Sequence, residues 1–275
     1  MEDTGSQHNK PMPSANKKTP RWLKVSLLTI VSVICLFIIF LRIIDYKFGT
    51  PSRLPYSGVH RVWAHRGYVN GCEENSITSF TKAIDAGAKG VELDILYIDK
   101  IGYIVSHGLP DADQLDKSLK LEDVFKTFGS RLHYWLDYKN LRDFSPSKAA
   151  EVCSRLKKML DKYNLNSNAY VESSNFDNLC IAAKTGLQCI HWQGVPASGS
   201  LPSYFYKRYL YEIKFIVNNI SAISCDYQSY SRMRDAYPSA NLYLFTANNN
   251  KAIKGLLKDK KVRVILTDKK LYNLK

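Results

Sequence analysis

Residues 25–41 form an uncharged, strongly apolar run with the sequence VSLLTIVSVICLFIIFL. The run continues past Arg42 into Ile43 and Ile44, and about 20 apolar residues are enough to cross a bilayer as a helix. Arg42 is compatible with such a helix, because its guanidinium can reach the headgroups while its stem stays in the apolar layer. We therefore predict one transmembrane helix at residues 25–44.

A cleaved signal peptide is the alternative interpretation of this run. The run is longer than the usual apolar core of a signal peptide. It is followed by Arg42, Asp45, Tyr46 and Lys47, where a cleavage site would require small residues. These features favour an uncleaved signal-anchor.

Basic residues are more frequent before the apolar run than after it. Residues 1–24 carry five of them and are rich in Ser, Pro, Asn and Gln, which predicts a basic, disordered tail. The flank after the run carries Arg42, Lys47 and Arg53. Since positively charged flanks stay in the cytoplasm, we expect a cytoplasmic N-terminus and residues 50–275 on the extracytoplasmic side.

After a linker at residues 45–60, short β-rich runs alternate with longer helix-compatible stretches such as Ser76–Ala86 and Pro146–Tyr163. The predicted strands are Arg61–His65, Gly90–Ile95, Leu132–Tyr138, Ala169–Ser173, Leu187–Trp192, Ala222–Tyr227, Asn241–Phe245 and Val262–Leu266. Eight such units in about 225 residues predict an α/β fold, a (β/α)8 TIM barrel at residues 61–275, with its active site at the carboxyl ends of the strands.

The formal net charge of +14 suits an anionic ligand, such as a phospholipid headgroup or a phosphorylated metabolite, although a merely solvated basic surface also accounts for it. Nucleic acid is not an expected partner, because the basic residues are scattered and no zinc spacing, RNA-binding aromatic signature or basic helix accompanies them. The six cysteines lack the paired short spacing that structural zinc requires.

Two carboxylates lie in the second predicted strand, which contains the sequence Val91–Ile95. Because strand side chains alternate in direction, Glu92 and Asp94 share one face and the apolar residues share the other. In a barrel the apolar face packs on the helices, so both carboxylates point inward near the strand end. Carboxylate oxygens there are ligands for hard cations such as Mg²⁺ or Ca²⁺.

The third predicted strand repeats this pattern with Asp137 and Lys139, a third carboxylate and a cation suited to a phosphate oxygen. A half-solvated amphipathic strand gives the same alternation without any function. Two histidines favour the functional interpretation, since His65 closes the first strand and His107 closes a short apolar run before turn residues. Such a pair can act as acid and base.

These residues resemble the signature of the glycerophosphodiester phosphodiesterase family, in order and at compatible spacing. The matching segments are His65–Gly67, Glu74–Ser76, Gly87–Ala88, Val91–Asp94, His107, Leu136–Lys139, Ser173–Ser174, Phe245–Asn248 and Ile265–Asp268. The resemblance implies a barrel enzyme, a phosphoric diester hydrolase, that acts on a glycerophosphodiester or a lysophospholipid.

The resemblance also implies a role for each site residue. Glu92, Asp94 and Asp137 would hold a divalent cation, Mg²⁺ or Ca²⁺. Arg66 and Lys139 would bind the phosphate. His65 and His107 would transfer protons. Glu74 and Asn75 would supply a further cation ligand or hold the ligands in place. Glu172 is a candidate for the mouth of the site, although an ordinary exposed strand-end residue accounts for it better.

Three positions depart from the family pattern: Glu73 replaces a proline, Gly108 replaces an aspartate and Asp137 replaces the more common glutamate. Only residues 108–120 separate His107 from the next predicted helix, which suggests a shorter cap over the site. The run from His107 to Pro110 also resembles the sphingomyelinase D branch of the same superfamily, whose members form a cyclic phosphate.

Two alternatives therefore stand beside the hydrolase. One is an enzyme of the sphingomyelinase D or lysophospholipase D type that uses the same histidines and cation. The other is a noncatalytic barrel displayed on the membrane to bind a phosphorylated ligand or a protein. The presence of the whole set of candidate catalytic residues favours an enzyme.

Overall fold

The structure is a computed structural model, and it describes residues 20–53, 55–196 and 201–274. The chain divides into two compact units, residues 1–43 and residues 44–275. Most of the predicted basic tail at residues 1–24 lies outside the described residues.

A single helix, α1 (Arg21–Gly49), contains the apolar run. By length and composition it is capable of crossing a membrane. The helix continues to Gly49, so the first residues of the predicted linker at residues 45–60 are helical. Its last turn belongs to the second unit, where Ile44 and Phe48 are buried.

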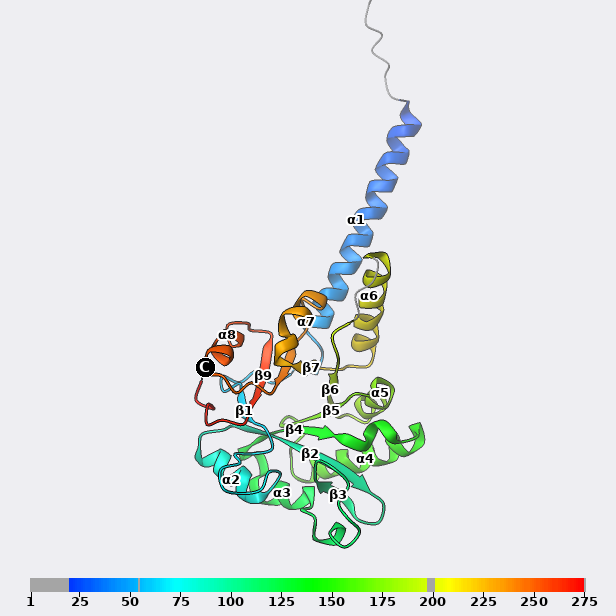
Figure 1. The fold of residues 1–275 in the computed structure, drawn as a ribbon. Coiled ribbons are helices and arrows are strands. Elements are labelled where there is room, and N and C mark those ends of the chain that lie inside the picture. The colour runs from blue at the N-terminus through cyan, green and yellow to red at the C-terminus, as the bar shows by residue number, and fades with distance from the viewer. Residues whose placement is uncertain (1–19, 54, 197–200, 275) are drawn as a thin grey trace, which may run out of the picture. The chain divides into compact units, whose positions relative to one another are not determined.

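The second unit is a barrel of eight parallel strands in the described residues (Figure 1). The ring closes where β1 pairs with both β9 and β2. The strands are β1 (Val62–Ala64), β2 (Gly90–Ile98), β4 (His133–Tyr138), β5 (Ala169–Ser173), β6 (Gln188–Trp192), β7 (Ala222–Asp226), β8 (Leu242–Phe245) and β9 (Val262–Thr267). The predicted (β/α)8 fold is confirmed, with each strand close to its expected range.

Helices follow the strands and cover the outside of the barrel (Figure 1). The α-helices of this unit are α2 (Ile77–Asp85), α3 (Leu121–Phe128), α4 (Pro146–Lys162), α5 (Phe176–Lys184), α6 (Leu201–Val217), α7 (Tyr230–Ala236) and α8 (Asn250–Leu256). Short 3-10 helices lie at η1 (Leu115–Lys117), η2 (Gly129–Arg131), η3 (Lys139–Asp143) and η4 (Tyr227–Ser229).

A ninth strand, β3 (Gly102–Val105), pairs antiparallel with the end of β2 and was not among the predicted strands. It forms because β2 runs to Ile98, past its predicted end at Ile95, and the chain then reverses. Gly102 has a φ of 92° in this reversal, a conformation that glycine adopts without a steric cost. The hairpin carries the chain back along β2 before α3 begins at Leu121, as expected.

Side-chain alternation divides the barrel into an outer and an inner core. In β1, Val62 and Ala64 pack toward the helices, whereas Trp63 points into the barrel. The inner core contains an aromatic plug, which we define as Tyr56, Trp63, Trp135, Tyr170 and Tyr243. Residues two positions farther along the same strands therefore also point inward, at the carboxyl ends of the strands.

Candidate active site

A cavity of about 320 Å³ opens at the carboxyl ends of the barrel strands. Its floor includes Trp135 of the aromatic plug. Its lining brings together most of the predicted site residues with several others: His65, Arg66, Glu92, Trp135, Asp137, Tyr138, Lys139, Arg142, Glu172, Ser173, Ser174, Trp192, Phe245 and Leu266.

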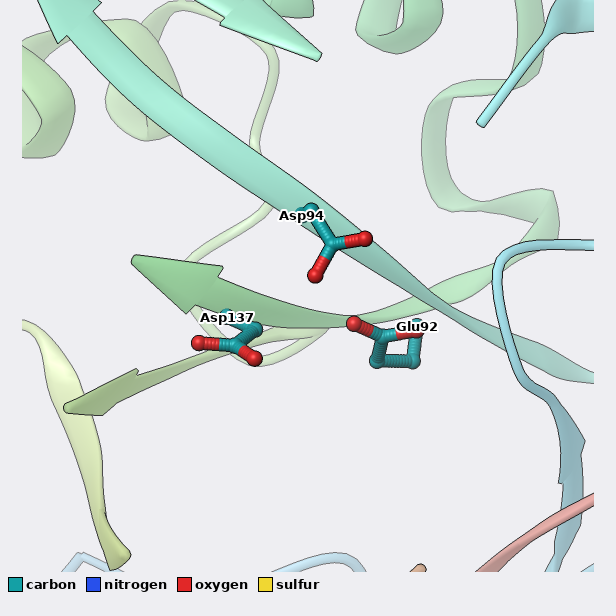
Figure 2. Close-up of side chains that lie close together, drawn as sticks. All are labelled: Glu92, Asp94 and Asp137. Atoms are coloured by element: carbon teal, nitrogen blue, oxygen red, sulfur yellow. The ribbon is translucent and has the colours of Figure 1, made fainter. Parts of the chain in front are cut away.

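Three carboxylates meet beside this cavity (Figure 2). Glu92 and Asp94 come from β2 and Asp137 comes from β4, with Asp94 directly opposite Asp137 in the strand register. One oxygen from each lies within 4.8 Å of the others. The alternation that predicted a shared face for Glu92 and Asp94 therefore places them with the third carboxylate.

Two cations neutralise part of this cluster. The Nε atom of Arg66 lies 2.9 Å from Oδ2 of Asp94, and Nζ of Lys139 lies 2.8 Å from Oδ1 of Asp94. Lys139 also pairs with Asp137. Asp94 is fully buried, so its charge is stabilised by these two cations in place of water.

Asn75 holds Asp94 in position from the loop after β1. Its Nδ2 donates to Oδ2 of Asp94 at 2.8 Å, and its Oδ1 accepts from the Asp94 amide at 3.2 Å. Glu74, the neighbouring residue, accepts a hydrogen bond from Arg66 at 3.0 Å and is not one of the three clustered carboxylates. Arg66 and Asn75 have φ values of 54° and 51°, and such left-handed residues concentrate at functional sites.

Burial makes the carboxylate cluster a poor place for unbalanced negative charge. Desolvation, together with the charges of Asp94 and Asp137, raises the pKa of Glu92 well above its usual range. Desolvation also raises the pKa of Asp137, although Lys139 opposes this effect. An all-oxygen set of close carboxylates fits a hard divalent cation, which would relieve the mutual repulsion.

His65 is held by a chain of hydrogen bonds from the end of the barrel. Its Nδ1 lies 2.7 Å from Oδ1 of Asp268, and Oδ2 of that carboxylate accepts from Asn248 at 2.6 Å. The hydrogen bond from His65 lowers the pKa of Asp268, and the hydrogen bond from Asn248 adds a smaller effect in the same direction. Asp268 is therefore ionised at neutral pH. An ionised carboxylate only accepts, so Nδ1 of His65 carries the proton and Nε2 faces Glu92 at 3.9 Å.

His107 lies apart from the cavity lining. It follows β3, and the amide of the preceding residue, Ser106, donates to the carbonyl of Asp94 at 3.0 Å. The side chain of His107 is exposed, and it is not among the cavity-lining residues. The structure therefore brings His65, but not His107, into contact with the described site.

Glu172 connects the cavity to the aromatic plug. One carboxylate oxygen accepts from Nε1 of Trp135 at 2.8 Å, and the other accepts from the hydroxyl of Ser224. Burial, with the nearby charge of Asp137, raises the pKa of Glu172 to about 8. The favoured interpretation of Glu172 as an exposed strand-end residue is wrong, because its side chain is buried and lies in the cavity wall.

Residues 65–174 match the model of the glycerophosphoryl diester phosphodiesterase family. Over this segment the chain is similar to that family. The matched segment runs from His65 to Ser174 and includes every candidate site residue named from the sequence. The predicted enzyme class, phosphoric diester hydrolase, is confirmed at the level of the family. No curated protein sequence matches the chain.

Solved structures of similar fold include a glycerophosphodiester phosphodiesterase from Parabacteroides distasonis, which is 17% identical and has a TM-score of 0.59; the match covers 76% of this chain and 92% of that chain. Another is a glycerophosphodiester phosphodiesterase from Thermotoga maritima, which is 22% identical and has a TM-score of 0.56; the match covers 76% of this chain and 95% of that chain. A phosphodiesterase from Oleispira antarctica in complex with the product sn-glycerol-3-phosphate has 15% identity over 76% and 92% and a TM-score of 0.56. At these identities the likeness establishes the shared fold.

Asp268 received no role from the sequence, although it holds His65 in the structure. A signal was present, because Asp268 directly follows the last strand, and polar residues at strand ends were the criterion that selected Asp137 and His65. The contact between Asp268 and His65 could not be predicted from the sequence, since it joins residues 203 positions apart in the chain.

Proposed function

We propose that this chain is a membrane-anchored phosphodiesterase that cleaves a glycerophosphodiester to an alcohol and glycerol phosphate with a divalent cation, Mg²⁺ or Ca²⁺. The observation that carries the proposal is the oriented imidazole of His65, whose free Nε2 lies beside three clustered carboxylates in one cavity. The glycerol phosphate product named for the Oleispira antarctica relative supports the same reaction class.

Glu92, Asp94 and Asp137 would hold the cation, which when bound offsets negative charge on a nonbridging phosphate oxygen. Arg66 and Lys139 neutralise these carboxylates in the structure. Both side chains border the cavity, so they are placed to turn toward a bound phosphodiester. Their charges then stabilise the phosphate by charge-assisted hydrogen bonds.

His65 acts as one proton-transfer group. With Nδ1 donating to Asp268, Nε2 is free to accept a proton from the attacking water or to return one to the leaving alkoxide. Asp268 stabilises the imidazolium that forms in either case, as an ionised carboxylate does beside a charged imidazole. His107 is proposed as the second group, supported by its position one residue after the amide that bonds to the Asp94 strand.

Anchoring through α1 completes the proposal. The helix is apolar and long enough to cross a membrane, with residues 25–44 as the span. The greater number of basic residues before the span supports a cytoplasmic N-terminus and an extracytoplasmic barrel. A substrate at the membrane surface, such as a lysophospholipid, and a soluble glycerophosphodiester are both compatible with this placement.

The decisive experiment assays the full chain in detergent on a panel of glycerophosphodiesters and lysophospholipids. Turnover is measured with Mg²⁺ or Ca²⁺, with a chelator, and in His65→Ala and His107→Ala variants. His60→Ala, at the opposite end of the barrel, is the matched control. We expect turnover that needs cation and that falls about 10²-fold to 10⁴-fold in the His65 variant.

The reaction product distinguishes the two enzymatic alternatives. Glycerol phosphate would indicate hydrolysis, and a cyclic phosphate would indicate an enzyme of the sphingomyelinase D type. A folded chain without turnover on any diester would overturn the enzymatic proposal in favour of a binding barrel. Turnover that survives in His107→Ala would remove that residue from the mechanism.

A further inference from the structure

Helix α6 carries an apolar face on the outside of the barrel. Tyr206, Leu210, Ile213 and Val217 are 69%, 39%, 36% and 73% exposed, respectively. Their spacings of four, three and four residues place them on one side of the helix. The opposite side packs inward through buried residues that include Phe215. A helix that is apolar on both sides is expected to be covered on both.

Helix α4 shows that the barrel itself does not require this outer face. It has the same length as α6, 17 residues, and also covers the outside of the sheet (Figure 1). Its exposed positions include Glu151, Arg155, Lys158 and Lys162, which are charged. The apolar outer face of α6 therefore calls for a specific occupant.

The last turn of α1 packs on α6 within the barrel unit. The ring of Phe48 meets that of Phe215 edge-on at 5.0 Å between centroids. Asp45 pairs with Arg208, which also pairs with the buried Glu212 at 2.8 Å. Asp45 directly follows residue 44, the end of the proposed span. Continuity of the chain therefore keeps α6 close to the lipid in which residues 25–44 are anchored.

Two exposed lysines, Lys207 and Lys214, lie seven residues apart, which places them on one flank of the apolar face of α6. Tyrosine and lysine side chains beside an apolar stripe suit a membrane interface, where rings reach the acyl boundary and ammonium groups meet phosphates. Each lysine near an anionic leaflet adds favourable attraction. Residues 45–275 carry +10 of the net charge of +14, and this charge acts in the same direction.

We propose that the outer face of α6, defined as Tyr206, Leu210, Ile213 and Val217 with the flanking Lys207 and Lys214, binds the surface of an anionic phospholipid bilayer. The face then acts as a second membrane contact that fixes the barrel on the surface to which α1 tethers it. This inference rests on the proposed anchoring through α1.

The test uses the full chain in nanodiscs of phosphatidylcholine and phosphatidylserine that carry a lipid-attached quencher. In a Cys35→Ala, Cys72→Ala background, a fluorophore is attached at Tyr206→Cys. The matched control is Thr81→Cys, an exposed position on α2, which lies across the ring of strands from α6. Retained diester turnover in both labelled chains verifies the fold.

We expect quenching at residue 206 to be several-fold stronger than at residue 81, and to fall when phosphatidylserine is omitted or when Lys207 and Lys214 are changed to Gln. Equal quenching at the two positions in an inserted chain overturns the proposal. If the nanodiscs contain two chains each and the label at residue 206 is not quenched, the face binds a second copy of the chain, and the proposal is overturned. Release of the chain by alkaline carbonate would instead refute the anchoring, whatever the turnover.

Discussion

The two ends of the barrel interior are built from neighbouring positions of the same strands and differ completely in chemistry. Trp135 and Asp137 lie two residues apart in β4, and Tyr170 and Glu172 lie two residues apart in β5. The first of each pair belongs to the aromatic plug and the second faces the cavity. One step of about 7 Å along a strand therefore separates a dry aromatic core from a charged site.

The plug shapes the electrostatics of the site above it. The interior below the carboxylates is filled with rings, such as Trp63 against Tyr56 at 4.9 Å, and the cavity lies at the other end of the barrel. Polar tips within the plug are satisfied, since the Tyr243 hydroxyl accepts from the Tyr56 amide at 2.9 Å. The plug thus supplies the desolvation that raises the pKa of Glu92 and Glu172.

The largest expected effect is a loss of activity on substitution at the open end of the barrel. His65→Ala is expected to lower kcat/KM about 10³-fold, because a positioned acid or base contributes roughly 10² to 10⁴. The melting temperature should change little, since His65 is only half-buried at the open end. Steady-state kinetics and thermal unfolding of the same detergent-solubilised sample provide the measurement. Loss of folding without a specific loss of turnover would contradict the assignment.

The plug should show the opposite behaviour. Trp63→Ala removes a fully buried ring and is expected to cost about 3 to 5 kcal/mol of unfolding free energy. Thermal or chemical unfolding measures this cost. Trp192→Ala is the matched control, because Trp192 lines the cavity and is 45% exposed. A cost as large for Trp192 as for Trp63 would show that the open end also carries the stability of the barrel.

The pH dependence of stability tests the protonation of Glu172, which lies between the aromatic plug and the cavity. Its pKa of about 8 in the folded chain exceeds the usual value of 4.5, so the folded state keeps a proton that the unfolded state releases. Stability from this group is therefore full below pH 4.5 and declines as pH rises to about 8, by an amount on the order of a few kcal/mol. In chelator, unfolding curves should show this decline in the native chain and a smaller one in Glu172→Gln. Parallel declines would mean that Glu172 is ionised in the fold.

The smallest expected effect concerns the orientation of His65. Asp268→Asn keeps the shape of the side chain but loses the charge that holds the imidazole, so kcat is expected to fall by about 10-fold to 10²-fold, less than for loss of the imidazole itself. KM should stay nearly constant, because Asp268 contacts His65 and does not line the cavity. Asn248→Ala, which removes the hydrogen bond to the other oxygen of Asp268, should give a weaker form of the same defect. A change in KM alone would indicate that Asp268 binds substrate.

The strand pattern could be predicted because it is local. Alternation along Val91–Ile95 was enough to place Glu92 and Asp94 on one face, and the family resemblance named the residues that line most of the cavity. The hairpin of β2 and β3 was missed because pairing of β3 depends on where β2 ends. A short apolar run at residues 103–105 does not specify its partner strand.

What the sequence by itself determined about this protein is the apolar run, the barrel and the identity of its charged strand ends, since each follows from periodicities of a few residues. Only the tertiary structure decided that Asp268 meets His65, that Arg66 and Lys139 share Asp94, and that α6 turns an apolar face outward. These features join residues distant in the chain, and their contacts depend on how the ring of strands closes.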